Sequence, residues 1–196
     1  MAALDFETTG LDPARDDVVS FGIVPVRAGR VVFRERVYRE VSPAVPLTAR
    51  SIVIHGIRPV DVAEAPPIDS AGEVLRSSLD QRVVLAWAAH VEAAFLTNVF
   101  GGHPRRWLRR CIDVLRLAVL VDRLEGRAVG PGGYALEAAA TRFGVPVERP
   151  HHALDDALTT AQLFLVMASK LARRGSPTVH RLLRASRSTR LPTRPG

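Results

Sequence analysis

The sequence predicts one α/β domain built on a single mixed β-sheet. Its 196 residues suit one domain whose core needs no disulfide for stability. Runs rich in β-branched residues occupy the first part of the chain, which favours strands there. Extended and helical patterns then alternate along the chain, and this alternation is typical of an α/β sheet domain.

The first part of the chain predicts three antiparallel strands. A short strand is expected over Ala2 to Phe6. Val18 to Val26 and Val31 to Val41 are β-branched runs on either side of Arg27 to Arg30, a spacing that predicts a hairpin. Together the three strands would form a meander.

The middle of the chain predicts helices around two short extended segments. Ser70 to Leu79 has the spacing of an amphipathic helix, and Val83 to Trp87 is wholly apolar, as in a buried strand. A helix is expected over Glu92 to Phe100, a short segment around Cys111 to Asp113, and another helix over Val114 to Leu124. Asp113 is placed to cap that helix.

The last part predicts two helices after a loop of residues 126–133. Tyr134 to Phe143 reads as a helix that ends at Gly144, a residue suited to a helix C-terminus. Apolar residues then recur at helical spacing up to about Leu171. They are Leu154, Leu158, Ala161 and Leu165.

The formal charge of +7 is concentrated at the C-terminal end. Residues 1–156 carry 19 arginines and all 20 acidic residues, whereas residues 157–196 carry seven arginines, Lys170 and no acid. We expect a folded domain over residues 1–172 and a basic, flexible tail over residues 173–196. Such a tail is either a solvated terminus or a contact for a phosphate backbone.

Composition limits the location of the protein. No apolar run reaches the roughly 18 residues that a membrane span needs, and the first residues are too few and too acidic for a signal peptide. Cys111 is the only cysteine, so no internal disulfide can form, and a buried side chain is expected there. We expect a cytoplasmic protein with no membrane partner.

An acidic pair at the start of the chain carries the main functional signal. Asp5 and Glu7 are two residues apart in a predicted strand, so their side chains point to the same face while Phe6 turns into the core. A turn sequence, Thr8 to Pro13, follows directly. Paired carboxylates are either solvated acids at a strand end or ligands for a hard cation such as Mg²⁺ or Mn²⁺.

Two segments far apart in the chain resemble the motifs of one enzyme family. Asp-Phe-Glu-Thr-Thr-Gly-Leu-Asp-Pro from Asp5 resembles the first motif of the DEDDh 3′–5′ exonucleases, the group that includes the proofreading epsilon subunit of bacterial DNA polymerase III. His-His-Ala-Leu-Asp-Asp-Ala from His151 resembles their third motif. The resemblance covers roughly residues 1–171. It implies a ribonuclease H-like fold with a mixed five-stranded sheet flanked by helices.

The second motif of that family departs from its usual form here. The family has His-Asn-x-x-Phe-Asp-x-x-Phe-Leu, and the segment from Trp87 to Leu96 keeps the spacing and the final Phe-Leu. It places Trp87 and Ala88 at the His-Asn positions and Glu92 at the Asp position. Glu92 is either a longer metal ligand or a solvated acid in the first turn of a helix.

The resemblance implies roles for residues of this chain. Asp5, Glu7 and Asp156 would hold one divalent cation, Mg²⁺ or Mn²⁺, and Asp5 with Glu92 would hold a second. His151 would be the general base, with its neighbour His152 as the alternative. Asp155 competes in the same way with Asp156, and we expect it to face solvent or cap a helix.

Substrate contacts are expected from two further segments. The family uses the loop after the first acidic pair at the terminal nucleotide, which implies Thr8, Thr9, Gly10 and Leu11 here, or else a plain turn. His55 and Ile57 resemble a segment that contacts the terminal base, and a short helix end is the alternative. Phe95 and Trp87 are expected in the core, because both lie in apolar runs.

We therefore expect a metal-dependent 3′–5′ exonuclease. It would act on 3′ ends of single-stranded DNA, or RNA, release nucleoside 5′-monophosphates by a two-metal mechanism, and work with a polymerase or repair partner. The alternative is a catalytically weak module that binds nucleic acid or assists a polymerase and retains the same fold.

Overall fold

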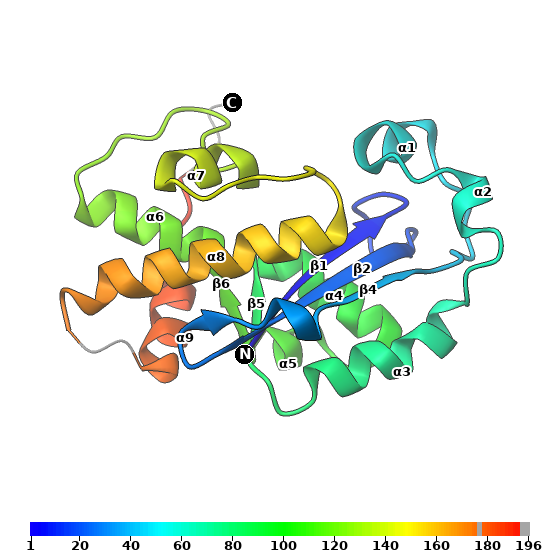
Figure 1. Ribbon diagram of the computed structural model, residues 1–196, viewed down its shortest axis with the longest axis horizontal. Coiled ribbons are helices and arrows are strands. Elements are labelled where there is room, and N and C mark those ends of the chain that lie inside the picture. Colours follow the sequence, from blue (N-terminus) through cyan, green and yellow to red (C-terminus); the bar gives the residue numbers. More distant parts are fainter. Residues whose placement is uncertain (176–177, 193–196) are drawn as a thin grey trace.

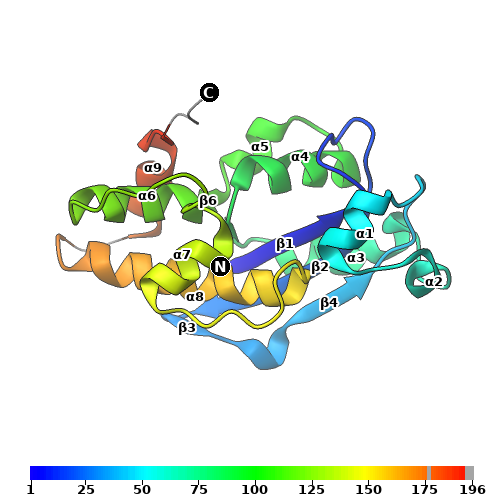
Figure 2. The ribbon, with the colours of Figure 1, turned by 90° about the horizontal axis from the view of Figure 1, so that it is seen from above.

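The fold is a mixed sheet with helices on both faces (Figures 1 and 2). It comes from a computed structural model that describes residues 1–175 and 178–192. The strands are β1 (Ala2–Thr8), β2 (Val18–Arg27), β3 (Arg30–Val31), β4 (Val37–Glu40), β5 (Val84–Ala86) and β6 (Cys111–Asp113). The order β3-β2-β1-β5-β6 runs across the sheet, and β4 also pairs with β2. Since β3 and β4 share the outer edge of β2, the sheet is five positions wide, as predicted.

The sheet is antiparallel on one side of β1 and parallel on the other. β2 pairs antiparallel with both β1 and β4, so the predicted meander is confirmed. The third strand is interrupted by η1 (Phe33–Glu35), because Phe33 to Arg36 supplies only one apolar side chain for a sheet face. β5 and β6 run parallel to β1 and to each other. The C-terminal ends of β1, β5 and β6 therefore meet at one edge of the sheet.

Nine α-helices surround this sheet in the described part of the chain. They are α1 (Ala49–His55), α2 (Pro59–Val62), α3 (Ile68–Leu79), α4 (Ala89–Phe100), α5 (Pro104–Leu108), α6 (Val114–Leu124), α7 (Leu136–Phe143), α8 (Ala153–Ala172) and α9 (Val179–Ser188). The helix predicted from Glu92 begins earlier, at Ala89, and the one predicted from Tyr134 begins at Leu136. Asp113 caps α6 as expected, since its carboxylate accepts a hydrogen bond from the Arg116 amide at 2.9 Å.

Two apolar cores lie on the two faces of the sheet. One face packs against α6, α7, α8 and α9, and the other packs against α3 and α4; Figure 2 shows β1 running between α8 and α4. Side chains alternate along β1, so Ala3 lies in the first core and Leu4 in the second. Cys111 and Phe95 are buried in the second core, as predicted.

Part of the expected tail is helical in this structure. α9 lies within residues 173–196 and packs against α6 through the buried Leu182. Arg116 and Arg123 of α6 donate hydrogen bonds to the carbonyls of Thr189 and Arg190 just after α9, at 3.0 and 2.7 Å. Arg194 lies outside the described residues. The flexibility expected of this stretch stays a prediction.

None of the helices in the described ranges combines the length and the apolarity needed to cross a bilayer.

Candidate metal and active site

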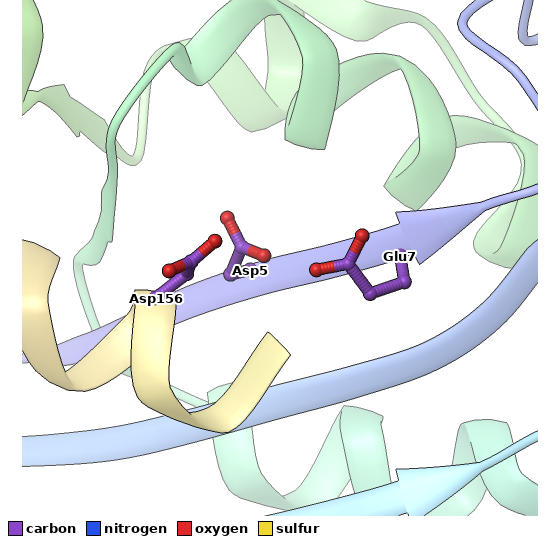
Figure 3. Close-up of side chains that lie close together, drawn as sticks. All are labelled: Asp5, Glu7 and Asp156. Atoms are coloured by element: carbon purple, nitrogen blue, oxygen red, sulfur yellow. The ribbon is translucent and has the colours of Figure 1, made fainter. Parts of the chain in front are cut away.

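Three carboxylates converge at the C-terminal half of β1. Asp5 and Glu7 project from the same face of the strand, and Asp156 reaches them from the first turn of α8 (Figure 3). One oxygen from each of the three residues lies within 4.8 Å of the others. Asp156 is more than 140 residues from the other two in sequence, so the fold brings this group together.

Gly22 permits the close approach of α8 to the sheet. It pairs with Asp5 across β2 and β1. A Cβ atom at this position would lie 2.2 Å from the carbonyl oxygen of Ala153 and 2.4 Å from Cα of Leu154, both in the first turn of α8. Any side chain would therefore push the helix away from the sheet. The absence of one allows Asp156 to sit against Asp5.

The entry to α8 is shaped by His151. This residue has φ +59°, in the left-handed region, which turns the chain sharply into the helix. Its backbone amide donates a hydrogen bond of 3.0 Å to Oδ2 of Asp156. The bond fixes the Asp156 carboxylate beside the backbone of the residue expected to act as a base.

Glu92 approaches the same group from α4 on the other face. Its side chain is only 5 % exposed, and its Oε2 atom has no hydrogen-bond partner among the described residues. The charge of Glu92 acts on Asp5, where it is the largest charge effect on the pKa. Glu92 is thus a buried acid directed at the cluster and not a solvated acid at a helix start.

Burial disfavours the ionised form of all four acids, and neighbouring carboxylates add to this effect. The pKa of Asp5 is raised well above its usual value by burial and then by Glu92, Glu7 and Asp156. Burial, followed by the charge of Asp156, raises the pKa of Glu7 to about 8. Burial is also the main cause that raises the pKa of Glu92 to about 8 and that of Asp156 to about 6.

This donor set fits a divalent cation. All the donors are carboxylate oxygens, which hard cations prefer. The orphaned Oε2 of Glu92 is a buried acceptor that lacks a donor in the protein, and a cation would satisfy it. A bound positive charge would also favour the ionised carboxylates, which burial and neighbouring acids disfavour. The four acids can therefore hold metal.

The two adjacent histidines have different surroundings. The His151 side chain is 52 % exposed, lines the cleft above the acids, and places Nε2 at 3.6 Å from Oε1 of Glu137. The His152 ring stacks on Tyr38 with centroids 4.7 Å apart, and its Nδ1 lies 3.3 Å from Asp155. Burial lowers the pKa of His152. Of the two, only His151 lines the cleft.

Asp155 was expected to face solvent or cap a helix, and the expectation of solvent exposure is wrong. The residue is buried, and its Oδ2 lies 2.7 Å from Nε of Arg149. The same oxygen contacts His152. Arg149 follows Pro146 in a short loop, and no sequence pattern linked it to Asp155. Asp155 therefore has partners of its own in Arg149 and His152, and it is not part of the group formed by Asp5, Glu7 and Asp156.

A cleft of about 690 Å³ opens over the four acids. The loop residues predicted to contact substrate line it, as does His55. The loop residues are Thr8, Thr9, Gly10 and Leu11. Thr9 donates a hydrogen bond to Asp16 at 3.1 Å and accepts one from the Asp17 amide at 3.0 Å, which holds the loop in shape. Ile57 instead packs with Val19 and Val62 beneath the surface.

His55 presents a buried donor to the cleft. Its Nδ1 accepts a hydrogen bond of 3.0 Å from the Ile57 amide, so the proton of the neutral ring is on Nε2. Nε2 is buried and lacks a partner in the described part of the chain. Burial and then the charge of His151 lower the pKa of His55, which favours this neutral form.

Several residues that line the cleft were missed or placed in the core by sequence reasoning. Glu137, Ile54 and Arg50 line the cleft, and the sequence alone assigned none of them to the site. Ile54 is 45 % exposed, and an exposed apolar residue in the short α1 was a signal that could have identified it. Trp87 is largely buried as expected, yet it also borders the cleft, and its Nε1 donates to the Tyr134 carbonyl at 3.2 Å.

Comparison with protein families and curated proteins gives a consistent answer. Residues 2–164 match the family model of the exonucleases (RNase T). The chain is 30% identical over 176 residues to a DNA polymerase III PolC-type of Thermotoga maritima, covering 88% of this chain and 12% of that protein. It is 32% identical over 177 residues to a DNA polymerase III subunit epsilon-like protein of Rhodobacter capsulatus, covering 89% of this chain and 24% of the relative. The chain thus spans a quarter or less of these relatives.

Solved structures show the same fold. The structure of exonuclease X in complex with 5′ overhanging duplex DNA matches with a TM-score of 0.66 and 23% identity, over 94% of this chain and 98% of that one. The structure of Escherichia coli exonuclease I with a dT13 oligonucleotide matches with a TM-score of 0.74 and 18% identity, over 88% and 42%. These likenesses confirm the predicted ribonuclease H-like fold.

Proposed function

The chain belongs to the exonuclease family, and we propose that it is a 3′–5′ exonuclease that hydrolyses the terminal phosphodiester bond of single-stranded DNA and releases nucleoside 5′-monophosphates. The observation that carries this proposal is the convergence of Asp5, Glu7 and Asp156, with Glu92 beside them, at the floor of an open cleft. The similar structures are complexes with duplex DNA and with a dT13 oligonucleotide, which supports DNA as the substrate. Hydrolysis of RNA 3′ ends should be measured beside hydrolysis of DNA 3′ ends of the same sequence.

The four acids would hold two divalent cations, Mg²⁺ or Mn²⁺. Asp5, Glu7 and Asp156 would bind one, and Asp5 with Glu92 the other. When bound, the pair of ions would neutralise charge developing on the phosphate and make water more acidic. Glu92 is one methylene longer than the aspartate that the family has at this position. We propose that the backbone of α4 lies slightly further from the metal here and that the longer side chain makes up this distance.

His151 would take the proton from the attacking water. Its ring is half exposed above the acids, so water can reach it, and imidazole is the side chain that most often serves as a general base. Oε1 of Glu137 lies 3.6 Å from Nε2 of this ring. The negative charge of Glu137 would stabilise the imidazolium that forms and hold the ring over the cleft. Glu137 is thus proposed as a positioning residue.

The loop after β1 and helix α1 would hold the terminal nucleotide between them. Leu11 is 79% exposed and Ile54 is 45% exposed, and both line the cleft, so they offer apolar surface to a base. The Nε2 proton of His55 would donate to a sugar or phosphate oxygen. The rigid Thr8 to Leu11 loop would approach the 3′ hydroxyl.

The test uses single-stranded DNA labelled at either the 5′ or the 3′ end, incubated with Mg²⁺ or Mn²⁺. The wild-type protein should release a labelled mononucleotide from the 3′ end and shorten the 5′-labelled strand stepwise. Asp5→Asn should abolish both signals, while Asp80→Asn, at an exposed site after α3, should retain them. Equal activity of wild type and Asp5→Asn would refute the proposal.

The second candidate is a nucleic-acid-binding or polymerase-accessory module with little catalysis. It is favoured by the altered second motif, in which Trp87, Ala88 and Glu92 replace the family's residues, and by the similarity to an epsilon-like protein, which points to a polymerase partner. Such a module would bind DNA in EDTA, with an affinity that falls as salt rises. Metal-dependent release of nucleotides would exclude it.

A further inference from the structure

A second hollow lies beside the cleft at the first turn of α4. Its volume is about 430 Å³. Ala88 lines the cleft, whereas the next two residues, Ala89 and His90, line this second hollow. Since consecutive Cα atoms are about 3.8 Å apart, the two hollows approach each other at this turn. Both lie near the C-terminal ends of β5 and β6.

The second hollow is strongly positive and continues along α9. A third hollow of about 440 Å³ shares Arg109 and Arg187 with it. We call the two hollows together the arginine groove, because five of the charged residues that line it are arginines. They are Arg105, Arg109, Arg116, Arg184 and Arg187, with His90 and His180 and a single acid, Asp113. Arg116 is paired with Asp113 at 3.4 Å.

The other four arginines of the groove keep their charge available. Arg105, Arg109, Arg184 and Arg187 are all exposed, and within the described ranges none of them has an acidic partner within ion-pair distance. Arg187 donates hydrogen bonds to the carbonyls of Leu108 and Arg109, which ties α9 to the end of α5 without neutralising charge. The groove is therefore a fixed surface with an unbalanced positive charge.

We propose that the arginine groove binds the phosphodiester backbone of the substrate strand beyond the nucleotide held in the cleft. This inference rests on the proposed exonuclease function. Arg50 is the only arginine among the described residues that line the cleft, whose floor is acidic. Phosphates of the strand thus need cations elsewhere, and the groove supplies them at the cleft's border. The planar guanidinium group also matches phosphate geometry.

The experiment compares two double variants of the full chain. Arg109→Gln/Arg184→Gln removes one charge from the C-cap of α5 and one from α9. Arg30→Gln/Arg39→Gln removes two exposed charges from β3 and β4, at the opposite edge of the sheet, as the matched control. Binding of a labelled oligonucleotide of about 16 nucleotides is measured in EDTA across salt concentrations. Hydrolysis of that oligonucleotide and of a dinucleotide is measured with Mn²⁺.

The groove variant should bind the oligonucleotide roughly tenfold more weakly at low salt, and the salt slope should fall by about 1.4, since each phosphate contact contributes about 0.7 for single strands. Its kcat/KM should fall about tenfold on the oligonucleotide at low salt and stay unchanged on the dinucleotide, which occupies only the cleft. The control should match wild type.

Equal binding by the groove and control variants would overturn the inference, and it is the result expected if the groove serves an acidic protein instead. Loss of dinucleotide hydrolysis in the groove variant would also overturn it, because the groove would then act on the cleft itself. Failure of the wild-type protein to hydrolyse either substrate would reject the proposed exonuclease activity, whereas the binding measurement would still decide the role of the groove.

Discussion

Replacing Glu92 by glutamine should stabilise the metal-free protein at alkaline pH while impairing metal-dependent activity. The folded protein raises the pKa of Glu92 from 4.5 to about 8, mainly by burial. Between these two pH values the folded protein binds more protons than the unfolded chain, so the free energy of unfolding falls as pH rises. Glutamine has no charge to lose and removes this dependence.

The magnitude follows from the burial of the carboxylate. A pKa difference of this size corresponds to about 4 kcal/mol of lost stability near pH 8 and about 1 kcal/mol near pH 5. The glutamine amide would leave buried donors unpaired beside the unpartnered Oε2 position, which costs about 1–3 kcal/mol at either pH. The stability of Glu92→Gln relative to wild type should therefore improve by about 3 kcal/mol from about pH 5 to about pH 8.

The assay is thermal unfolding in EDTA at these two pH values. For a chain of this length, about 3 kcal/mol corresponds to a change of about 6–12 °C in the Tm difference. Glu64→Gln, at an exposed site, should follow wild type at both pH values. If the Tm difference between Glu92→Gln and wild type were the same at both pH values, the acid cluster would not carry the charge strain inferred here. Adding Mn²⁺ should raise the Tm of wild type more than that of the variant.

Four other sites give further expected outcomes. Asp5→Asn should lower kcat by about 10³-fold or more, since the loss of a shared ligand forfeits several kcal/mol of charge stabilisation; retained activity in steady-state assays would argue against the metal role. His151→Gln should lower kcat by about 10²–10⁴-fold with little change in DNA binding. Glu137→Gln should lower it only about fivefold, because its contact with His151 is long and half exposed, so a larger loss would indicate direct contact with substrate. Gly22→Ala should destabilise the protein by at least about 3 kcal/mol in chemical denaturation, because the new Cβ would overlap backbone atoms of α8; wild-type stability would show that α8 can move.

Most of the sheet was predictable from the sequence, because the strands that flank β1 are apolar runs rich in β-branched residues. The alternation of Ala3, Leu4 and Phe6 around Asp5 fixes which face carries the acids, and the structure places them there. The interruption of the third strand by η1 was missed, since β-branched residues flank the charged turn on both sides. The packing of α9 was also missed, because seven arginines and no acid in residues 157–196 are typical of a solvated terminus, while the helix packs on the core through the buried Leu182 and the partly buried Leu183 and Ala185.

The candidate site was predictable where a residue's role depends on local spacing. The pair Asp5 and Glu7 and the helix entry at His151 are of this kind. Contacts that depend on the path of the loop before α8 were not predictable in the same way: Asp155 pairs with Arg149, and Glu137 faces His151 across that loop. Ile57 lies two residues after His55 but turns into the core, because Gly56 at φ +75° ends α1 and reverses the chain between them.

Gly22 shows how a single absent side chain links the fold to the chemistry. A glycine inside a β-strand usually weakens it, and in a sequence it signals a close backbone approach. Here the approaching backbone is the first turn of α8, which carries Asp156. The same approach buries Asp156, and burial is the main cause that raises its pKa to about 6. The packing that brings these carboxylates close enough to hold a cation would therefore also destabilise the cluster without one, so bound metal should raise the stability of this part of the sheet.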